Sequence, residues 1–131
     1  MYTILIVDDE RPAQTFLKAI CQKYCPAFDT ILLSGSADDA LRLMAQQHVH
    51  VLVTDISMPG INGIELAQRV RQLYPRTHTV IVSGYAEFEF ARGAIQAGVD
   101  DYLLKPVAYE RLAQLLDELS SMKRSTRKQM T

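Results

Sequence analysis

Five short apolar runs alternate with longer segments of helical periodicity along this chain. The runs are rich in Ile, Leu and Val, lack polar alternation, and cover residues 2–7, 30–33, 51–54, 79–83 and 102–104. Continuous apolarity of this kind is typical of strands that are covered on both faces, as in a parallel sheet. The alternation predicts an α/β fold with a doubly wound sheet and right-handed crossovers, although local patterns leave the strand order open.

The intervening segments place apolar residues at i, i+3, i+4 and i+7, so each is predicted to be an amphipathic helix. The first is expected to form one buried stripe of Ala13, Phe16, Leu17, Ile20, Cys21 and Tyr24. The other stripes are Ala37, Ala40, Leu41 and Met44 in the second helix, Ile64, Ala67 and Val70 in the third, and Leu112, Leu115, Leu116 and Leu119 in the fifth, after Pro106.

Start and stop signals bound several of these helices. Ser36 followed by Asp39 is an acidic variant of the capping box, and Asn62 followed by Glu65 marks the third helix. The fourth helix is predicted over residues 86–97, because Gly98 stands where a left-handed C-cap ends a helix.

Composition limits the class of protein. The chain has 131 residues, 48% of them hydrophobic and 22% charged, with a net charge of −1. These values fit one soluble domain and give no electrostatic reason to expect binding to nucleic acid or membrane. No apolar run approaches a membrane span of roughly 20 residues, and no signal peptide is evident, so a cytoplasmic location is expected. Cys21 and Cys25 are expected to be small buried apolar residues in a reducing compartment.

The last ten residues differ from the rest. Residues 122–131 contain Lys123, Arg124, Arg127 and Lys128 and no acid. We therefore expect a domain over residues 1–121, followed by a basic tail that either begins a linker to an effector domain or ends the protein.

Reactive side chains follow four of the five apolar runs. Asp8-Asp9-Glu10, Asp55, Ser83 and Lys105 come at these points. Ligand sites in open α/β sheets lie beyond the carboxyl ends of the strands, so these groups are predicted to converge. Two carboxylates roughly 4 Å apart repel by about 4 kcal/mol at an effective dielectric near 20, which a hard cation such as Mg²⁺ would offset.

Asp55 is the candidate nucleophile. It precedes a turn-rich loop, Ile56-Ser57-Met58-Pro59-Gly60, that would keep it accessible. A carboxylate can attack phosphorus and form an acyl phosphate, and phosphoryl transfer depends mainly on positioning and charge neutralisation. Lys105 suits the opposite side of a phosphoryl group, and Ser83 suits a hydrogen bond to it.

Four stretches together resemble the response-regulator receiver family over residues 2–121. They are Ile4-Leu5-Ile6-Val7-Asp8-Asp9-Glu10, Val53-Thr54-Asp55-Ile56-Ser57-Met58-Pro59-Gly60-Ile61-Asn62-Gly63, Val82-Ser83-Gly84-Tyr85, and Gly98-Val99-Asp100-Asp101-Tyr102-Leu103-Leu104-Lys105-Pro106. The resemblance implies a flavodoxin-like three-layer sandwich with strand order 2-1-3-4-5 and five helices. It also implies a phosphoacceptor domain rather than an enzyme with a separate substrate.

The resemblance implies a role for each matching residue. Asp8 and Asp9 would hold Mg²⁺ together with Asp55, the phosphoacceptor, and with the backbone carbonyl of Ser57. Lys105 would pair with the phosphoryl group, and the Lys105–Pro106 peptide bond would be cis.

The switch residues implied by the resemblance are Ser83, as its hydroxyl, and Tyr102, as its aromatic. For Tyr102 the pattern alone also fits an ordinary half-buried core residue. Tyr102 would turn inward when Ser83 engages the phosphoryl group, altering the surface of the fourth helix, fifth strand and fifth helix.

The implied partners are a sensor histidine kinase or phosphotransfer protein, docking beside Arg11, Pro12 and the first helix. The segments 83–91 and 100–106 are similar to receivers joined to AraC-type DNA-binding domains, so DNA would be reached only through an effector outside these residues; a stand-alone receiver is the alternative. Arg92 and Arg111 are candidates for a homodimer face or for a solvated charged surface.

Two other functions fit the sequence less well. A Mg²⁺-dependent aspartyl phosphohydrolase would have a second acid where Ser57 stands, and a cap domain for which the chain has no length. A flavin-binding module would have a phosphate-binding loop rich in Ser, Thr and Gly where Asp8-Asp9-Glu10 stands.

Overall fold

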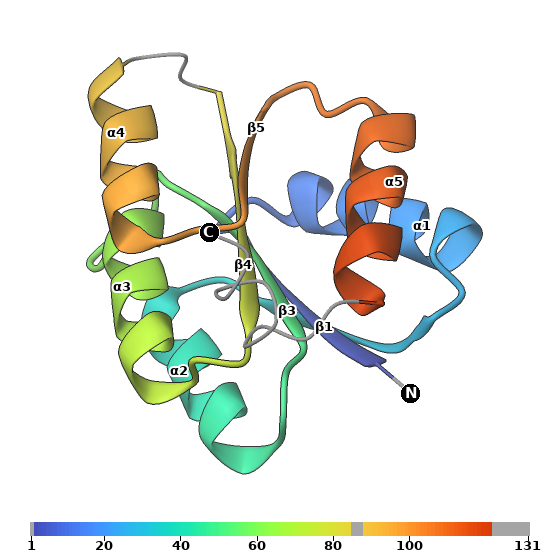
Figure 1. Cartoon of the computed structure of the whole chain (residues 1–131), viewed down its shortest axis with the longest axis horizontal. Helices are drawn as coiled ribbons and strands as arrows, with labels where there is room; N and C mark the ends of the chain where they lie inside the picture. Colours follow the sequence, from blue (N-terminus) through green and yellow to red (C-terminus); the bar gives the residue numbers. More distant parts are fainter. Residues whose placement is uncertain (1, 85–87, 122–131) are drawn as a thin grey trace.

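The computed structural model of the chain describes residues 2–84 and 88–121, and shows a five-stranded sheet between two layers of helices (Figure 1). All strand pairs are parallel, and the order is β2-β1-β3-β4-β5. The predicted fold class and strand order are therefore confirmed. The elements are β1 (Tyr2–Val7), α1 (Arg11–Tyr24), β2 (Phe28–Ser34), α2 (Ala37–Gln46), β3 (Val51–Asp55), α3 (Gly63–Leu73), β4 (His78–Ser83), α4 (Phe88–Ala97), β5 (Asp101–Leu104) and α5 (Tyr109–Ser120).

The core is divided by the sheet. On one face, α1 and α5 pack against β1, β3 and β4, with the four predicted leucines of α5 all buried. On the other face, α2 and α3 cover β1 and β3, and α3 and α4 cover β4 through a smaller cluster that includes Ile56, Ile81 and Ala94. Hydrophobic side chains thus fill both interfaces of a three-layer sandwich.

The sequence predicted strands that are buried on both faces, and this is true only of the strands at the centre of the sheet. Every residue of β3 and β4 is buried, whereas Asp29 and Thr30 in β2 and Leu104 in β5 are exposed. The prediction was wrong for β2 and β5 because they are edge strands with a neighbour on one side only.

The predicted buried stripe of α1 also needs correction. Leu17, Ile20 and Cys21 are buried, but Phe16 is 50% exposed and Tyr24 is 40% exposed. Phe16 lines an apolar groove beside the loop that follows β5, and Tyr24 stacks on Tyr109 of α5 at a ring-centroid distance of 4.7 Å.

The local signals at the helix ends are mostly confirmed. The side chains of Ser36 and Asn62 accept hydrogen bonds from the third residue after them, and Gly98 has a positive φ of 78°. The capping box at Ser36 is half formed, because its N–H donates to Ser34 Oγ rather than to Asp39. The first two residues predicted for the fourth helix lie outside the described part of the chain.

Two further expectations concern single residues. Cys21 and Cys25 are buried free thiols, and the Lys105–Pro106 bond is cis, both as predicted. Among the helices that the structure describes, none is long and apolar enough to cross a membrane.

Candidate functional site: an acidic pocket at the carboxyl edge of the sheet

The acidic turn after β1 is held by hydrogen bonds from its own backbone and from α1. The N–H of Asp8 donates to Ser34 O at 3.0 Å, which continues the pairing of β1 with β2. The N–H of Glu10 donates to Asp8 Oδ1 at 2.9 Å. Gln14 Nε2 donates to both Asp8 O, at 2.6 Å, and Ser34 O, at 3.1 Å. Gln14 therefore ties α1 to the ends of two strands.

Three strand ends meet where the sequence predicted. Lys105 Nζ lies 3.0 Å from Asp8 Oδ2 and 3.7 Å from Asp55 Oδ1. Asp8 is 1% exposed and Asp55 is 7% exposed, so both carboxylates are largely removed from water. A buried carboxylate needs a compensating positive charge, and Lys105 supplies one to each.

The loop after β3 fixes Asp55. The N–H of Ile56 donates to Asp55 Oδ1 at 2.9 Å, and the N–H of Gly63 donates to Ile56 O at 2.9 Å. Gly63 is needed for this closure, because a Cβ at that position would lie 2.0 Å from the Asp55 carbonyl oxygen. The start of α3 is thus pressed against the end of β3.

Opposing effects set the pKa of Asp55. Burial raises it most, and the nearby charges of Asp8 and Asp9 raise it too. Lys105 and the Ile56 N–H oppose this by stabilising the charged form, but the pKa of Asp55 stays above its ordinary value.

Lys105 experiences the opposite balance. Burial disfavours its charge, but the hydrogen bond to Asp8 and the charges of Asp55, Asp8 and Glu10 raise its pKa above the ordinary value. Its backbone N–H donates to Ser83 O at 2.8 Å, which places it directly beside the end of β4. The ammonium is therefore held charged next to the two buried carboxylates.

The acidic turn has the ligand chemistry that Mg²⁺ prefers. Carboxylate oxygens of Asp8, Asp9 and Glu10 all lie within 4.8 Å of one another. Asp9 and Glu10 are exposed and Asp8 is buried, so the cluster reaches from solvent to Asp55. Hard oxygen donors beside open water suit an ion that keeps several of its own waters. Glu10 was not among the predicted metal residues, and Ser57 is exposed in the loop after Asp55.

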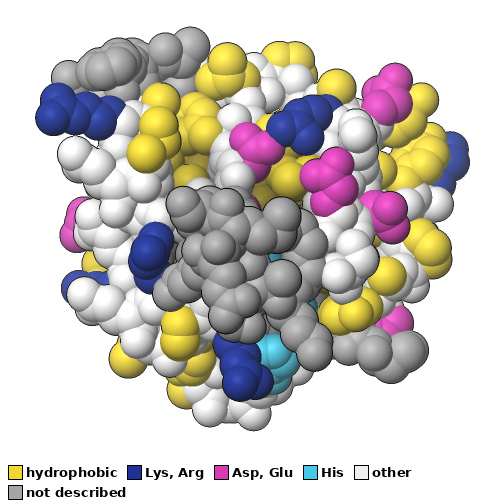
Figure 2. Space-filling view, viewed as in Figure 1, with side chains coloured by type: hydrophobic (Ala, Val, Ile, Leu, Met, Phe, Trp, Pro, Cys, Tyr) yellow, Lys and Arg dark blue, Asp and Glu magenta, His cyan; other side chains and the backbone are white. Residues whose placement is uncertain are grey.

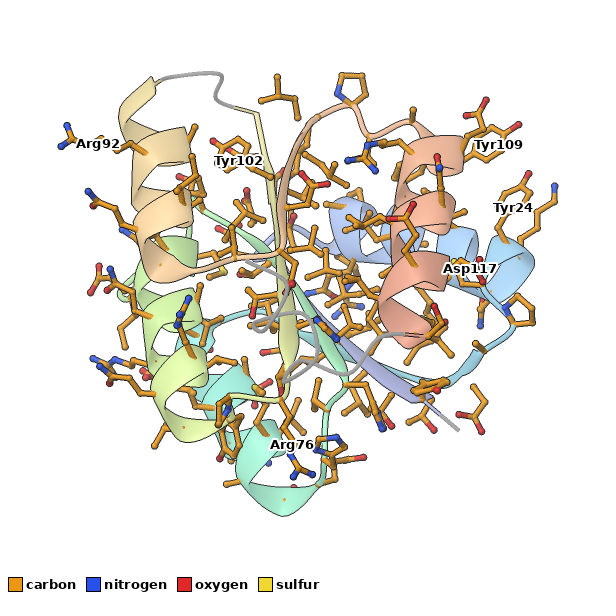
Figure 3. The ribbon with its side chains drawn as sticks, in the orientation of Figure 1. Tyr24, Arg76, Arg92, Tyr102, Tyr109 and Asp117 are labelled. Atoms are coloured by element: carbon orange, nitrogen blue, oxygen red, sulfur yellow. The ribbon has the colours of Figure 1, made fainter. Side chains whose placement is uncertain are left out.

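The two predicted switch residues lie at different depths. Ser83 is fully buried at the end of β4. Tyr102 is half-buried in β5, and its ring packs against the cluster of Ile81, Ala94 and Ala97 on the α4 side of the sheet (Figure 3). The structure thus brings Asp8, Asp55 and Lys105 into contact, whereas Tyr102 lies among core residues of α3 and α4.

Sequence reasoning missed Gln14 and Gly63. Each acts through a contact made by the folded chain, with the carbonyls of Asp8 and Ser34 in one case and of Asp55 in the other. The only local signal was the position of Gln14 shortly after the acidic turn.

The relatives of this chain carry a consistent description. The sequence model of the response regulator receiver domain matches residues 4–117. This chain is 32% identical to the "Uncharacterized transcriptional regulatory protein YesN" of Bacillus subtilis and 36% identical to the "Transcriptional regulatory protein HptR" of Staphylococcus aureus. Each match extends over 119 residues and covers 91% of this chain. The matched region makes up 32% and 46% of those proteins, so the chain spans less than half of either.

Solved structures agree with this. A signal receiver domain of an HD domain-containing protein from Pseudomonas fluorescens superposes with a TM-score of 0.87 at 26% identity, over 97% of this chain and 92% of that one. A CheY-like response regulator receiver domain protein from Methanospirillum hungatei gives a TM-score of 0.80 at 28% identity, over 91% and 96%. This chain belongs to the response regulator receiver domain family of two-component signalling.

Proposed function

We propose that this receiver domain is a phosphorylation-dependent switch in which Asp55 accepts the phosphoryl group. The observation that carries the proposal is the convergence of Asp8, Asp55 and Lys105, with the Lys105 ammonium 3.0 Å from one carboxylate and 3.7 Å from the other. A nucleophilic carboxylate, a second acid and a cation in one pocket are the parts that phosphoryl transfer to aspartate needs. Family membership leaves no reason to prefer the phosphohydrolase or flavin-binding alternatives.

Asp8, Asp9, Asp55 and the Ser57 backbone carbonyl would hold Mg²⁺. The clustered carboxylates of the acidic turn support this assignment. The ion, when bound, neutralises charge on the phosphoryl oxygens. Gln14 would position the acidic turn, because its side-chain amide donates hydrogen bonds to the backbone carbonyls of Asp8 and Ser34, at the ends of β1 and β2.

The remaining chemistry belongs to the side chains. An Asp55 oxygen attacks phosphorus while the bond from phosphorus to the donor nitrogen breaks, and Lys105 pairs with the phosphoryl group. The Ser83 hydroxyl then donates to a phosphoryl oxygen, and Tyr102 shifts within its cluster. Moving a two-state element from 1:99 to 99:1 requires about 5.5 kcal/mol, which several charge-assisted contacts can supply.

A sensor histidine kinase or phosphotransfer protein would dock across α1. Arg11 and Pro12 are exposed at its start. Beside them, an apolar groove of about 490 Å³ runs between Phe16 of α1 and Pro106 and reaches Lys105. A helix of the donor could seat an apolar side chain there and bring its phosphohistidine to the acidic pocket.

The output surface would be formed by α4, β5 and α5. Figure 2 shows exposed hydrophobic side chains along this face, with acidic and basic groups beside them. Ile95 is 76% exposed and Leu104 is also exposed, while Arg111 pairs with Asp101 and Arg92 projects outward from α4 (Figure 3). Such a face suits a homodimer contact whose geometry depends on Tyr102.

The downstream effect would be transcriptional. Relatives named as transcriptional regulatory proteins are two to three times longer than the matched region, which leaves length for an effector domain beside a receiver over residues 1–121. The AraC type of that domain is proposed from the resemblance of segments 83–91 and 100–106, and the linker from residue 122 from the basic composition of the tail. The domain would act in the cytoplasm as a phosphoacceptor, with catalysis limited to its own phosphorylation and dephosphorylation.

The proposal is tested by labelling with acetyl phosphate and Mg²⁺, followed by intact mass measurement. Wild-type protein and Asp38→Asn, which alters an exposed acid in α2, should each gain one phosphoryl group. Asp55→Asn should gain none, and chelation of Mg²⁺ should suppress labelling of wild type and of Asp38→Asn. Equal labelling of Asp55→Asn and wild type would exclude Asp55 as the acceptor.

A further inference from the structure

The only cysteines of the chain, Cys21 and Cys25, lie one helical turn apart at the end of α1, away from the acidic pocket. We propose that they form a dithiol site that binds a trivalent organoarsenical, with both sulfurs bonded to one arsenic atom. The inference is independent of the proposed function, because no step of phosphoryl transfer involves these residues.

Backbone hydrogen bonds fix the position of Cys25 relative to Cys21. Cys25 is the C-cap of α1, and its N–H donates to Cys21 O at 2.9 Å. Its own carbonyl accepts from the N–H of Phe28 at 3.0 Å. Cys21 is 1% exposed and Cys25 is 6% exposed, and both belong to the core cluster shared with the leucines of α5. The spacing of the two side chains is thus fixed by the fold.

A cavity connects the thiols to solvent. It has a volume of about 440 Å³, and its lining includes Cys21 and Cys25 together with half-buried Lys18 and exposed Gln22 and Asp29. A small organoarsenical can therefore reach two side chains that are otherwise buried.

The spacing favours one bridging atom over a disulfide. Residues at i and i+4 of a helix have Cβ atoms about 5–6 Å apart, whereas a disulfide needs about 3.5–4.5 Å. The backbone hydrogen bonds that join Cys25 to Cys21 and Phe28 oppose the movement of Cys25 that a disulfide would need. A bridging atom relaxes this requirement, since two bonds of roughly 2.3 Å, as in zinc thiolates, leave the sulfurs roughly 3.5 Å apart, against about 2.05 Å in a disulfide.

The ligand count distinguishes arsenic from zinc. A structural zinc site uses four protein ligands. Across residues 2–84 and 88–121, the single group of three or more possible ligands is Asp8, Asp9 and Glu10, to which neither cysteine belongs. An arsenical that carries one organic group requires two sulfurs only, and Cys21 and Cys25 supply both.

Hydrogen bonding between the thiols prepares the reaction. The Cys21 thiol donates to Cys25, which lowers the pKa of Cys25 and raises the pKa of Cys21. Cys25 is therefore the more readily ionised of the two thiols. With an arsenoxide, the arsenic–oxygen double bond is replaced by two arsenic–sulfur bonds, and the two thiol protons leave with the oxygen as one water. No atom is oxidised or reduced.

The experiment uses phenylarsine oxide with the whole folded chain and intact mass measurement. One adduct should form, both thiols should become unreactive to a thiol reagent, and the adduct should survive excess 2-mercaptoethanol but not ethanedithiol. Because the second bond forms within the molecule, we expect retention stronger by about a hundredfold than in Cys21→Ser or Cys25→Ser, whose adducts a monothiol should strip. Asp55→Asn should behave as wild type.

Three results with the arsenical would overturn the inference. They are no adduct on folded wild-type protein, an adduct that 2-mercaptoethanol removes from wild type, and equal retention by wild type and Cys25→Ser. The monothiol and dithiol arms need no variant, so they decide the question even if a serine variant does not fold. Binding of one zinc per chain that requires both cysteines would replace arsenic by zinc and overturn the choice of ligand.

Discussion

Lys105 controls the electrostatics of the acidic pocket because it is the cation in contact with both Asp8 and Asp55. Burial raises the pKa of Asp55, and two neighbouring acids add to that effect, so Asp55 depends on Lys105 to remain charged. In the proposed reaction, the same ammonium would pair with the incoming phosphoryl group. A single residue would therefore serve both the resting site and the reaction.

Replacing Lys105 by methionine should slow acetyl phosphate labelling of Asp55 by about a hundredfold, since one preorganised charge is lost from the site. The measurement is the initial rate of mass gain with saturating Mg²⁺. Lys23→Met is the matched control, because Lys23 is exposed and contacts Tyr24 rather than the pocket. Equal rates for the Lys105 variant and the control would contradict this role.

His50 makes the stability of the fold depend on pH. Its Nδ1 accepts a hydrogen bond from the N–H of Thr3 at 3.0 Å, so protonation there breaks the bond. Burial lowers the pKa of His50 and the neighbouring His48 lowers it further. The unfolded chain, with a His pKa of about 6.5, then takes up protons at a higher pH than the folded chain. The contribution is complete above that pH and is lost as the pH falls towards the folded pKa.

His50→Gln should therefore flatten the fall in stability between about pH 7.5 and about pH 5.5, where His titrates. The check is the urea midpoint at both values for wild type, His50→Gln and the exposed control His48→Gln, which should keep most of the dependence. An unchanged pH slope in His50→Gln would rule out this residue as its source.

Among the elements, α3 depends most on one close contact. It starts at Gly63, whose N–H donates to Ile56 O and whose Cα faces the Asp55 carbonyl. The N-cap Asn62 fixes the same end through the N–H of Glu65. Position and stability of the Asp55 loop are therefore coupled to the start of this helix.

Gly63→Ala should destabilise the domain by about 1–3 kcal/mol and reduce labelling of Asp55, because the new methyl group would displace the end of β3. Urea unfolding measures the first effect and mass gain the second. Gly35→Ala is the control, since a Cβ there has open space around it. If both variants unfold at the same urea concentration as wild type, the contact is less tight than described.

The sequence predicted the elements well where apolarity alone decides them. The five runs became strands, and the leucines of α5 became core, because burial follows directly from those side chains. It failed at Thr30 of β2, which lies in an edge strand, and at Phe16 of α1, which lines an open groove. Strand order is not a local property, and here it came from family resemblance.

The site could be predicted in part for a similar reason. Asp8, Asp55 and Lys105 each follow a strand, and parallel strands share one carboxyl edge, so their meeting follows from topology. Gln14 and Gly63 could not be found in this way. Their importance lies in contacts with backbone carbonyls, which any residue type presents.

At the scale of the whole molecule, the hydrophobic core is complete within the described residues that precede the basic segment 122–131. Leu112, Leu115, Leu116 and Leu119 complete the core on the α1 side, and α5 ends at Ser120. The receiver boundary at residue 121 is thus a prediction about cooperativity: residues 1–121 should fold as one unit.

A chain ending at residue 121 should melt at the same temperature as the full chain and accept a phosphoryl group equally well. A chain ending at residue 108 lacks α5, leaves its side of the sheet uncovered, and should not fold. Thermal unfolding followed by circular dichroism measures both. A large loss of stability on removing residues 122–131 alone would place the domain boundary further along the chain.

The central claim is that Asp55 carries the phosphoryl group that switches this domain. It is tested most directly by locating the modification, through acetyl phosphate treatment, reduction of the acyl phosphate with borohydride, proteolysis and mass measurement of the peptides. The account predicts that reduction converts Asp55 to homoserine, after a phosphorylation that requires Mg²⁺ and that is slower in Lys105→Met. Modification of Asp8 or Asp9 with Asp55 unchanged would contradict it.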